Sequence, residues 1–111
     1  MLAENPDLSG IYMTTASSAI ACQVIRQSCS QDLKIITTDL LRDTPDLLRS
    51  GIACATLFQN PFQQGEAVVK LLYDRLVLDK APDNRLLTPT FIFKSNLPDY
   101  LNGVGQTERN L

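Results

Sequence analysis

Three polar residues of the chain directly follow short apolar segments, and their side chains are of the types that bind neutral, hydroxyl-bearing molecules. They are Thr15, Asp39 and Gln59. A hydroxyl, a carboxylate and a carboxamide can hydrogen-bond the hydroxyls of a sugar, and none of them is a strong nucleophile or a base at neutral pH. The set therefore favours recognition over catalysis. Each residue also has a structural interpretation: Thr15 as a turn residue, Asp39 as the cap of the turn after it, and Gln59 as a solvated loop amide.

The rest of the sequence lacks the residues and motifs that are common in enzyme active sites. The chain has no histidine, which removes the usual general base and the usual catalytic triads. It contains none of the glycine-rich phosphate-binding patterns and no GxSxG pattern. Three cysteines, at 22, 29 and 54, lack a CxxC pair and are interpreted as buried thiols, so we expect no metal site and no cofactor.

The apolar segments predict the elements that position the three polar residues. Gly10–Thr14, Leu33–Thr38 and Ile52–Phe58 are predicted strands. Apolar residues at spacings of three and four predict a helix over Ala19–Cys29. A short helix is also predicted from Thr44, which can accept a hydrogen bond from a helix-start N–H and is followed by proline, to Gly51, a typical helix-end residue. This β-α-β-α-β order predicts an α/β fold with a parallel sheet, in which ligands bind beyond the carboxyl ends of the strands.

The second half of the chain has a different pattern. The longest predicted helix runs from Phe62 to Leu78, with apolar residues on one face and alternating charges on the other. Arg85–Lys94 is predicted to be extended, and Pro89 within it indicates an edge strand or a crossover. A helical turn is expected at Leu97–Leu101, capped by Ser95 or Asn96, before a polar tail.

Bulk properties limit the class of protein. The chain has 111 residues, 44% of them hydrophobic, and a formal net charge of -2, which fits one globular domain or a piece of one. Neither charge sign gathers into a block, so a nucleic-acid surface is not expected. Met1–Asp7 does not read as a signal peptide, and no apolar run reaches the roughly 20 residues that span a membrane. With reduced cysteines, these features predict a cytoplasmic protein.

Five stretches together resemble LacI-type transcriptional regulators and ribose-type binding proteins. Leu57–Pro61 followed by Gln64-Gly65 resembles their "Q-x-P…G" stretch, and Ile35–Asp39 resembles their "V-V-G-F-D" strand. Leu47–Gly51 resembles the helix between those motifs, and Gly10–Thr15 corresponds to a strand that ends in an Asn-Asp pair in the family. The chain departs from that pair, having Thr15-Ala16. The resemblance covers Asp7 to about Leu101.

The resemblance implies the type I periplasmic-binding-protein fold, here as a fragment with a crossover into a second lobe. Residues 1–59 would belong to the C-terminal lobe of an effector-binding domain, 60–92 to the N-terminal lobe, and 93–111 to the return and a flexible tail. Asp39 would stand in place of the aspartate that holds sugar hydroxyls, and Asn60-Pro61 would be a hinge between the lobes.

In function, the resemblance implies the effector-binding part of a LacI-type regulator whose DNA-binding domain is absent from this chain. The effector would be a sugar or a related small polar molecule, and the protein would be a homo-oligomer with no membrane partner and no nucleic-acid contact of its own. A periplasmic sugar-binding receptor of a transporter is the alternative, and a small α/β enzyme is a third. The apolar face of the 62–78 helix predicts self-association.

Overall fold

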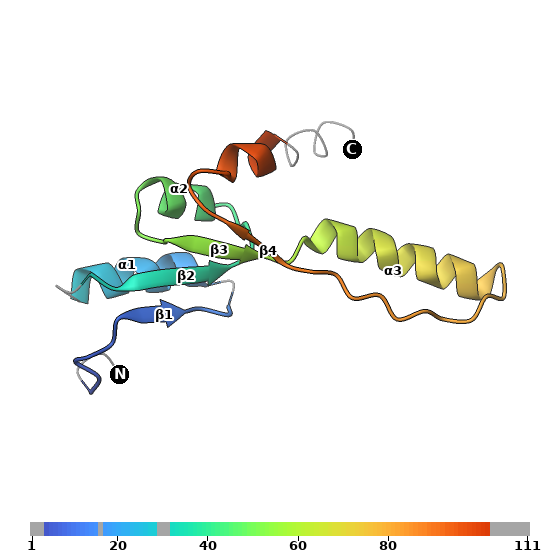
Figure 1. Ribbon diagram of the computed structural model, residues 1–111, viewed down its shortest axis with the longest axis horizontal. Helices are drawn as coiled ribbons and strands as arrows, with labels where there is room; N and C mark the ends of the chain where they lie inside the picture. The colour runs from blue at the N-terminus through green and yellow to red at the C-terminus, as the bar shows by residue number, and fades with distance from the viewer. Residues whose placement is uncertain (1–3, 16, 29–31, 103–111) are drawn as a thin grey trace. The chain divides into compact units, whose positions relative to one another are not determined.

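A computed structural model describes residues 4–15, 17–28 and 32–102, and it divides the chain into two compact units (Figure 1). Unit 1 comprises the chain up to Phe58 and from Phe91 onward, and unit 2 comprises Gln59–Thr90. The division falls close to the predicted hinge at Asn60-Pro61. The assignment of these units to two lobes of a larger domain stays a prediction.

The alternation of strands and helices in unit 1 follows the predicted order. Its elements are β1 (Gly10–Tyr12), α1 (Ser18–Ser28), β2 (Lys34–Thr38), α2 (Thr44–Arg49), β3 (Ala55–Phe58) and β4 (Thr90–Ile92), the last of which begins in unit 2. The four strands form one mixed, mostly parallel sheet in the order β1-β2-β3-β4. β2 pairs in parallel with β1 and with β3, so that Ile35 lies beside Ile11 and Thr37 beside Thr56. The predicted α/β fold class is confirmed.

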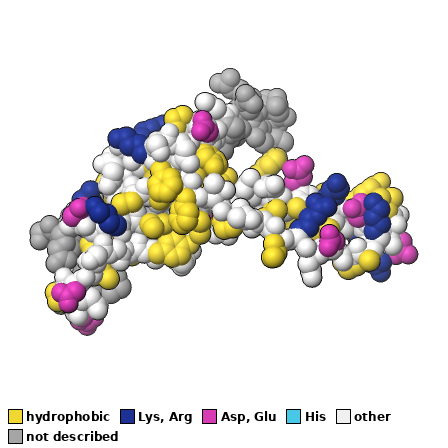
Figure 2. Space-filling view, viewed as in Figure 1, with side chains coloured by type: hydrophobic (Ala, Val, Ile, Leu, Met, Phe, Trp, Pro, Cys, Tyr) yellow, Lys and Arg dark blue, Asp and Glu magenta, His cyan; other side chains and the backbone are white. Residues whose placement is uncertain are grey.

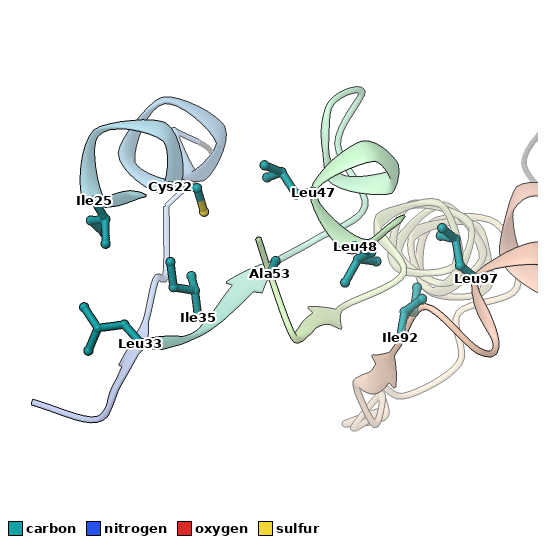
Figure 3. Close-up of a cluster of buried hydrophobic side chains, with 9 residues drawn as sticks. All are labelled: Cys22, Ile25, Leu33, Ile35, Leu47, Leu48, Ala53, Ile92 and Leu97. Atoms are coloured by element: carbon teal, nitrogen blue, oxygen red, sulfur yellow. The ribbon is translucent and has the colours of Figure 1, made fainter. Parts of the chain in front are cut away.

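The core of unit 1 lies between the sheet and the helices on one of its faces (Figure 3). The buried side chains come from α1, α2, the strands, the residues just before β2 and β3, and a helical turn at 97–102: Cys22, Ile25, Leu33, Ile35, Leu47, Leu48, Ala53, Ile92 and Leu97. Burying one leucine or isoleucine contributes about 1.5–3 kcal/mol. This cluster therefore stabilises the packing of the helices of unit 1 on the strands that carry the candidate site.

The opposite face of the sheet carries exposed aromatic side chains. Ile11 and Ile92 face the core, and alternation along a strand therefore turns Tyr12, Phe91 and Phe93 to the other side. The rings of Phe91 and Phe93 stack there at a centroid distance of 6.2 Å. Figure 2 shows hydrophobic side chains at the surface over the strands of this unit.

Unit 2 consists of α3 (Pro61–Leu76) and an extended segment at 79–89. Asn60 caps the helix, because its Oδ1 accepts a hydrogen bond from the N–H of Gln63 at 3.2 Å. The helix ends where the N–H of Lys80 reaches the carbonyl of Asp74, with Asp79 in the left-handed conformation between them. No residue of α3 is buried within the described chain.

Three local predictions from the sequence are wrong. Thr44 does not cap α2, because its Oγ1 accepts from the N–H of Leu41, a residue before the helix. β3 begins at Ala55 and not at Ile52, because the N–H of Ala53 bonds to the carbonyl of Leu47 in α2 and draws the chain out of the sheet.

The third wrong prediction concerns the cysteines. Cys22 is buried in the core as predicted, and burial raises the pKa of its thiol. Cys54 is instead exposed and lies directly before β3, between the buried Ala53 and Ala55. Cys29 lies outside the described residues.

Candidate functional site

Asp39 follows β2 in a backbone conformation that is uncommon for a residue with a side chain. Its φ is +64°, in the left-handed region. Outside glycine this region costs roughly 1–3 kcal/mol, although aspartate and asparagine tolerate it best. Such a conformation persists only where the surroundings hold it, and it occurs often at binding sites.

Both main-chain groups of Asp39, its N–H and its carbonyl, are hydrogen-bonded. Its N–H donates to the carbonyl of Leu57 at 2.9 Å, and its carbonyl accepts from the Oγ1 of Thr56 at 2.8 Å. The Oγ1 of Thr44 donates to the same carbonyl at 3.4 Å while it accepts from the N–H of Leu41. Thr44 and Thr56 are both buried, at 1% and 0% exposure. Asp39 is therefore fixed at the carboxyl end of β2 by residues of β3 and α2.

These two threonines are functional candidates that reasoning from the sequence missed. A threonine in an apolar strand is also explained by its preference for strands, so Thr56 gave no separate signal. Its bond to Asp39 spans 17 positions of the chain, and nothing in the sequence pairs the two.

Thr15 lies exposed in a bend three residues past β1. The end of β1 is tied to β2 by Thr38, whose Oγ1 lies 2.8 Å from the carbonyl oxygen of Met13 and 3.2 Å from the hydroxyl oxygen of Tyr12. β1 and β2 are parallel neighbours, so Thr15 and Asp39 follow the same edge of the sheet. The structure thus places two of the three predicted residues at one edge.

Gln59 is the first residue of unit 2 and directly follows β3. It is exposed, and its carbonyl accepts a hydrogen bond from the Nε2 of Gln64 at 2.8 Å, which ties it to the first turn of α3. Because Gln59 belongs to a different unit, its convergence with Thr15 and Asp39 on one ligand stays a prediction.

The chemistry of this edge is that of hydrogen-bonding recognition. Within residues 4–15, 17–28 and 32–102, no three or more His, Cys, Asp or Glu side chains are grouped to hold a metal ion. None of the helices in that part of the chain is long and apolar enough to cross a membrane. The carboxylate of Asp39, on a main chain that is hydrogen-bonded at both its N–H and its carbonyl, can accept hydrogen bonds from the hydroxyls of a polar ligand.

The sequence matches the family model described as "Periplasmic binding protein domain" over residues 1–80. The chain belongs to this family. No curated protein matches the sequence.

Solved structures of the type I periplasmic-binding-protein fold are similar to this chain. A glucose-galactose binding protein from Geobacillus stearothermophilus is 30% identical with a TM-score of 0.76, over 87% of this chain and 35% of that one. A solute binding protein of an ABC transporter from Agrobacterium vitis, bound with alpha-D-tagatopyranose, is 28% identical with a TM-score of 0.77, over 88% and 34%. A protein designated a LacI transcriptional regulator, from Bacteroides fragilis, is 25% identical with a TM-score of 0.74, over 89% and 34%.

This member of the periplasmic-binding-protein family therefore spans about a third of the length of the solved structures that it matches. The named neighbours are a glucose-galactose binding protein, a solute binding protein of an ABC transporter and a protein designated a transcriptional regulator, and all three have the same fold.

Proposed function

We propose that this chain forms part of a sugar-binding domain and that Asp39 accepts hydrogen bonds from the hydroxyls of the sugar. The observation that carries the proposal is the left-handed backbone of Asp39, held by three hydrogen bonds at the carboxyl edge of a parallel sheet. Ligands of open α/β sheets bind at this edge. A carboxylate with a fixed backbone loses little conformational entropy when it binds, which favours affinity.

The other predicted residues complete the proposed site. Thr15 contributes a hydroxyl from the same edge of the sheet, and Gln59 contributes an amide where the chain passes from unit 1 to unit 2. In this proposal residues 1–59 and 93–111 belong to one lobe and 60–92 to another, and the ligand is bound as the lobes close upon it.

We further propose that the sugar-binding domain serves a LacI-type transcriptional regulator in the cytoplasm. Cys22 and Cys54 are free cysteines, and Cys54 is exposed, which suits a reducing compartment. The regulator from Bacteroides fragilis has the same fold at 25% identity. The sugar would act as the effector, and DNA would be contacted by a separate domain and not by this fragment.

A sugar-binding receptor of a transporter is the second candidate. Two solved transporter-type or sugar-binding proteins are 28% and 30% identical to this chain, somewhat more than the regulator. Fractionation of cells that carry the tagged product of the complete coding sequence separates the two. Recovery in the cytoplasm supports the regulator, and recovery outside the inner membrane supports the receptor.

Binding is tested on the protein expressed from its complete coding sequence, with glucose, galactose and tagatose as probes in thermal shift and calorimetry. Asp39→Asn removes the charge and keeps both the shape and the tolerance of a left-handed backbone. Asp43→Asn is the matched control, because Asp43 is exposed four residues later and its side chain makes no capping bond to α2.

We expect at least one sugar to stabilise the wild type and Asp43→Asn, by about 2.7 kcal/mol at 100 times the Kd, and not Asp39→Asn. If no sugar stabilises the wild type, or if Asp39→Asn responds like the control, the proposal is wrong. Turnover of a sugar that is lost in Asp39→Asn would support the third possibility, a small enzyme.

We also propose that the protein is a homo-oligomer. No residue of α3 is buried within the described chain, and its side chains Phe62, Val69 and Tyr73 are exposed on one face. Exposed apolar stripes of this kind associate in water, since burial of apolar area is favourable.

A further inference from the structure

The carbonyl of Asp39 points out of the regular hydrogen-bond pattern of the sheet, because the left-handed conformation turns the chain at that residue. Two side-chain hydroxyls bind it in place of main-chain partners, Thr56 at 2.8 Å and Thr44 at 3.4 Å. The N–H of the same residue donates to the carbonyl of Leu57. Two consecutive residues of β3 thus hold the peptide groups on both sides of the Asp39 Cα.

We infer that Thr56 is a positioning residue that sets the direction of the Asp39 carboxylate toward its ligand. This inference rests on the proposed function, because Asp39 must bind the sugar for its direction to matter. The bond from Thr56 is the shorter of the two hydroxyl contacts, and Thr56 is wholly buried, so water does not replace its hydroxyl easily. Thr44 supports the same carbonyl from α2 at the longer distance.

The sheet supplies a matched control residue. Thr37 is the register partner of Thr56 on the neighbouring strand, and it is equally buried, at 0% exposure. Its hydroxyl has no hydrogen-bond partner among the described residues. Thr37→Val and Thr56→Val therefore replace the same side chain by the same isostere at adjacent buried positions, and only Thr56→Val removes a bond to Asp39.

The experiment measures sugar affinity by calorimetry for the protein from its complete coding sequence and for both variants, below the melting temperature of each. Without the Thr56 hydroxyl, the strained backbone of Asp39 relaxes toward other conformations in which the carboxylate points elsewhere. We expect Thr56→Val to weaken binding on the order of tenfold, Thr37→Val to leave it within about twofold, and Thr56→Ser to restore most of it.

A second readout does not depend on the ligand. Hydrogen exchange at the Asp39 amide, followed by NMR in the unliganded protein, should become about tenfold faster in Thr56→Val and stay unchanged in Thr37→Val. A Thr56→Val protein that binds sugar as tightly as Thr37→Val does would overturn the positioning role. If the wild type binds no sugar, the proposed function fails, and unchanged exchange at Asp39 would then reject the positioning role separately.

Discussion

At the scale of single residues, the left-handed backbone of Asp39 has a cost in stability that can be measured. Asp39→Gly and Asp39→Ala both remove the carboxylate and differ only in the Cβ atom. In the left-handed region glycine is free of the steric cost that alanine bears, so we expect the glycine variant to be more stable by about 1 kcal/mol. Urea unfolding followed by circular dichroism measures the difference. Equal stabilities, or a more stable alanine variant, would mean that Asp39 is not held in this conformation in solution.

The hydroxyl of Thr37 is a buried polar group without a hydrogen-bond partner among the described residues. It lost its bonds to water on folding and gained none in the described chain. Thr37→Val keeps the shape and removes that cost, so we expect unfolding to require about 1 kcal/mol more. The melting temperature and the urea midpoint should both rise. A lower midpoint would show that the hydroxyl is bonded in solution.

Asp39 was predictable from the sequence because a carboxylate directly after a buried strand is unusual and because the "V-V-G-F-D" motif of the family ends on the same residue. The hydroxyls of Thr44 and Thr56 were not, since their common partner is a main-chain carbonyl, which every residue has. Their role depends on the positive φ of Asp39. In a sequence, glycine is the residue that most clearly signals a positive φ, and position 39 is an aspartate.

At the scale of elements, the order of strands and helices was predictable because each has its own apolar period. β1, α1, β2, α2 and β3 all lie within the predicted segments or one residue beyond them. The ends were less predictable because they depend on bonds between elements. β3 starts late because the carbonyl of Leu47, at the other side of a turn, takes the N–H of Ala53.

The same substitution, glycine to alanine, is expected to have opposite effects on stability at two positions in or next to helices. Gly65 lies inside α3, and a Cβ added there would meet nothing within 4 Å, so Gly65→Ala should stabilise the helix by roughly 1 kcal/mol. Gly51 follows α2 with a φ of +74°, so Gly51→Ala should destabilise unit 1 by a similar amount. Chemical denaturation compares them. Destabilisation by Gly65→Ala would instead reveal a partner packed closely over that position.

At the scale of the whole molecule, much apolar surface is exposed among the described residues. One face of the sheet in unit 1 is covered by helices, while Tyr12, Phe91 and Phe93 are exposed on the other. In unit 2, every residue of α3 keeps access to solvent. This chain covers only about a third of the length of the solved structures that it matches, so the same fold there has more elements with which to bury such faces.

The exposed face of α3 makes the predicted self-association testable in the 111-residue chain. Val69 is 68% exposed at the middle of that face, and lysine favours helices more than valine does. Val69→Lys therefore disrupts an apolar contact without unfolding the helix. Leu86→Lys is the control, since Leu86 is 98% exposed in the segment outside any helix or strand.

By light scattering at micromolar concentration, we expect the wild type and Leu86→Lys to exceed the monomer mass and Val69→Lys to approach it. A monomeric wild type would exclude self-association, and an oligomeric Val69→Lys would move the contact to another face, with the exposed aromatic face of the sheet as the next to substitute.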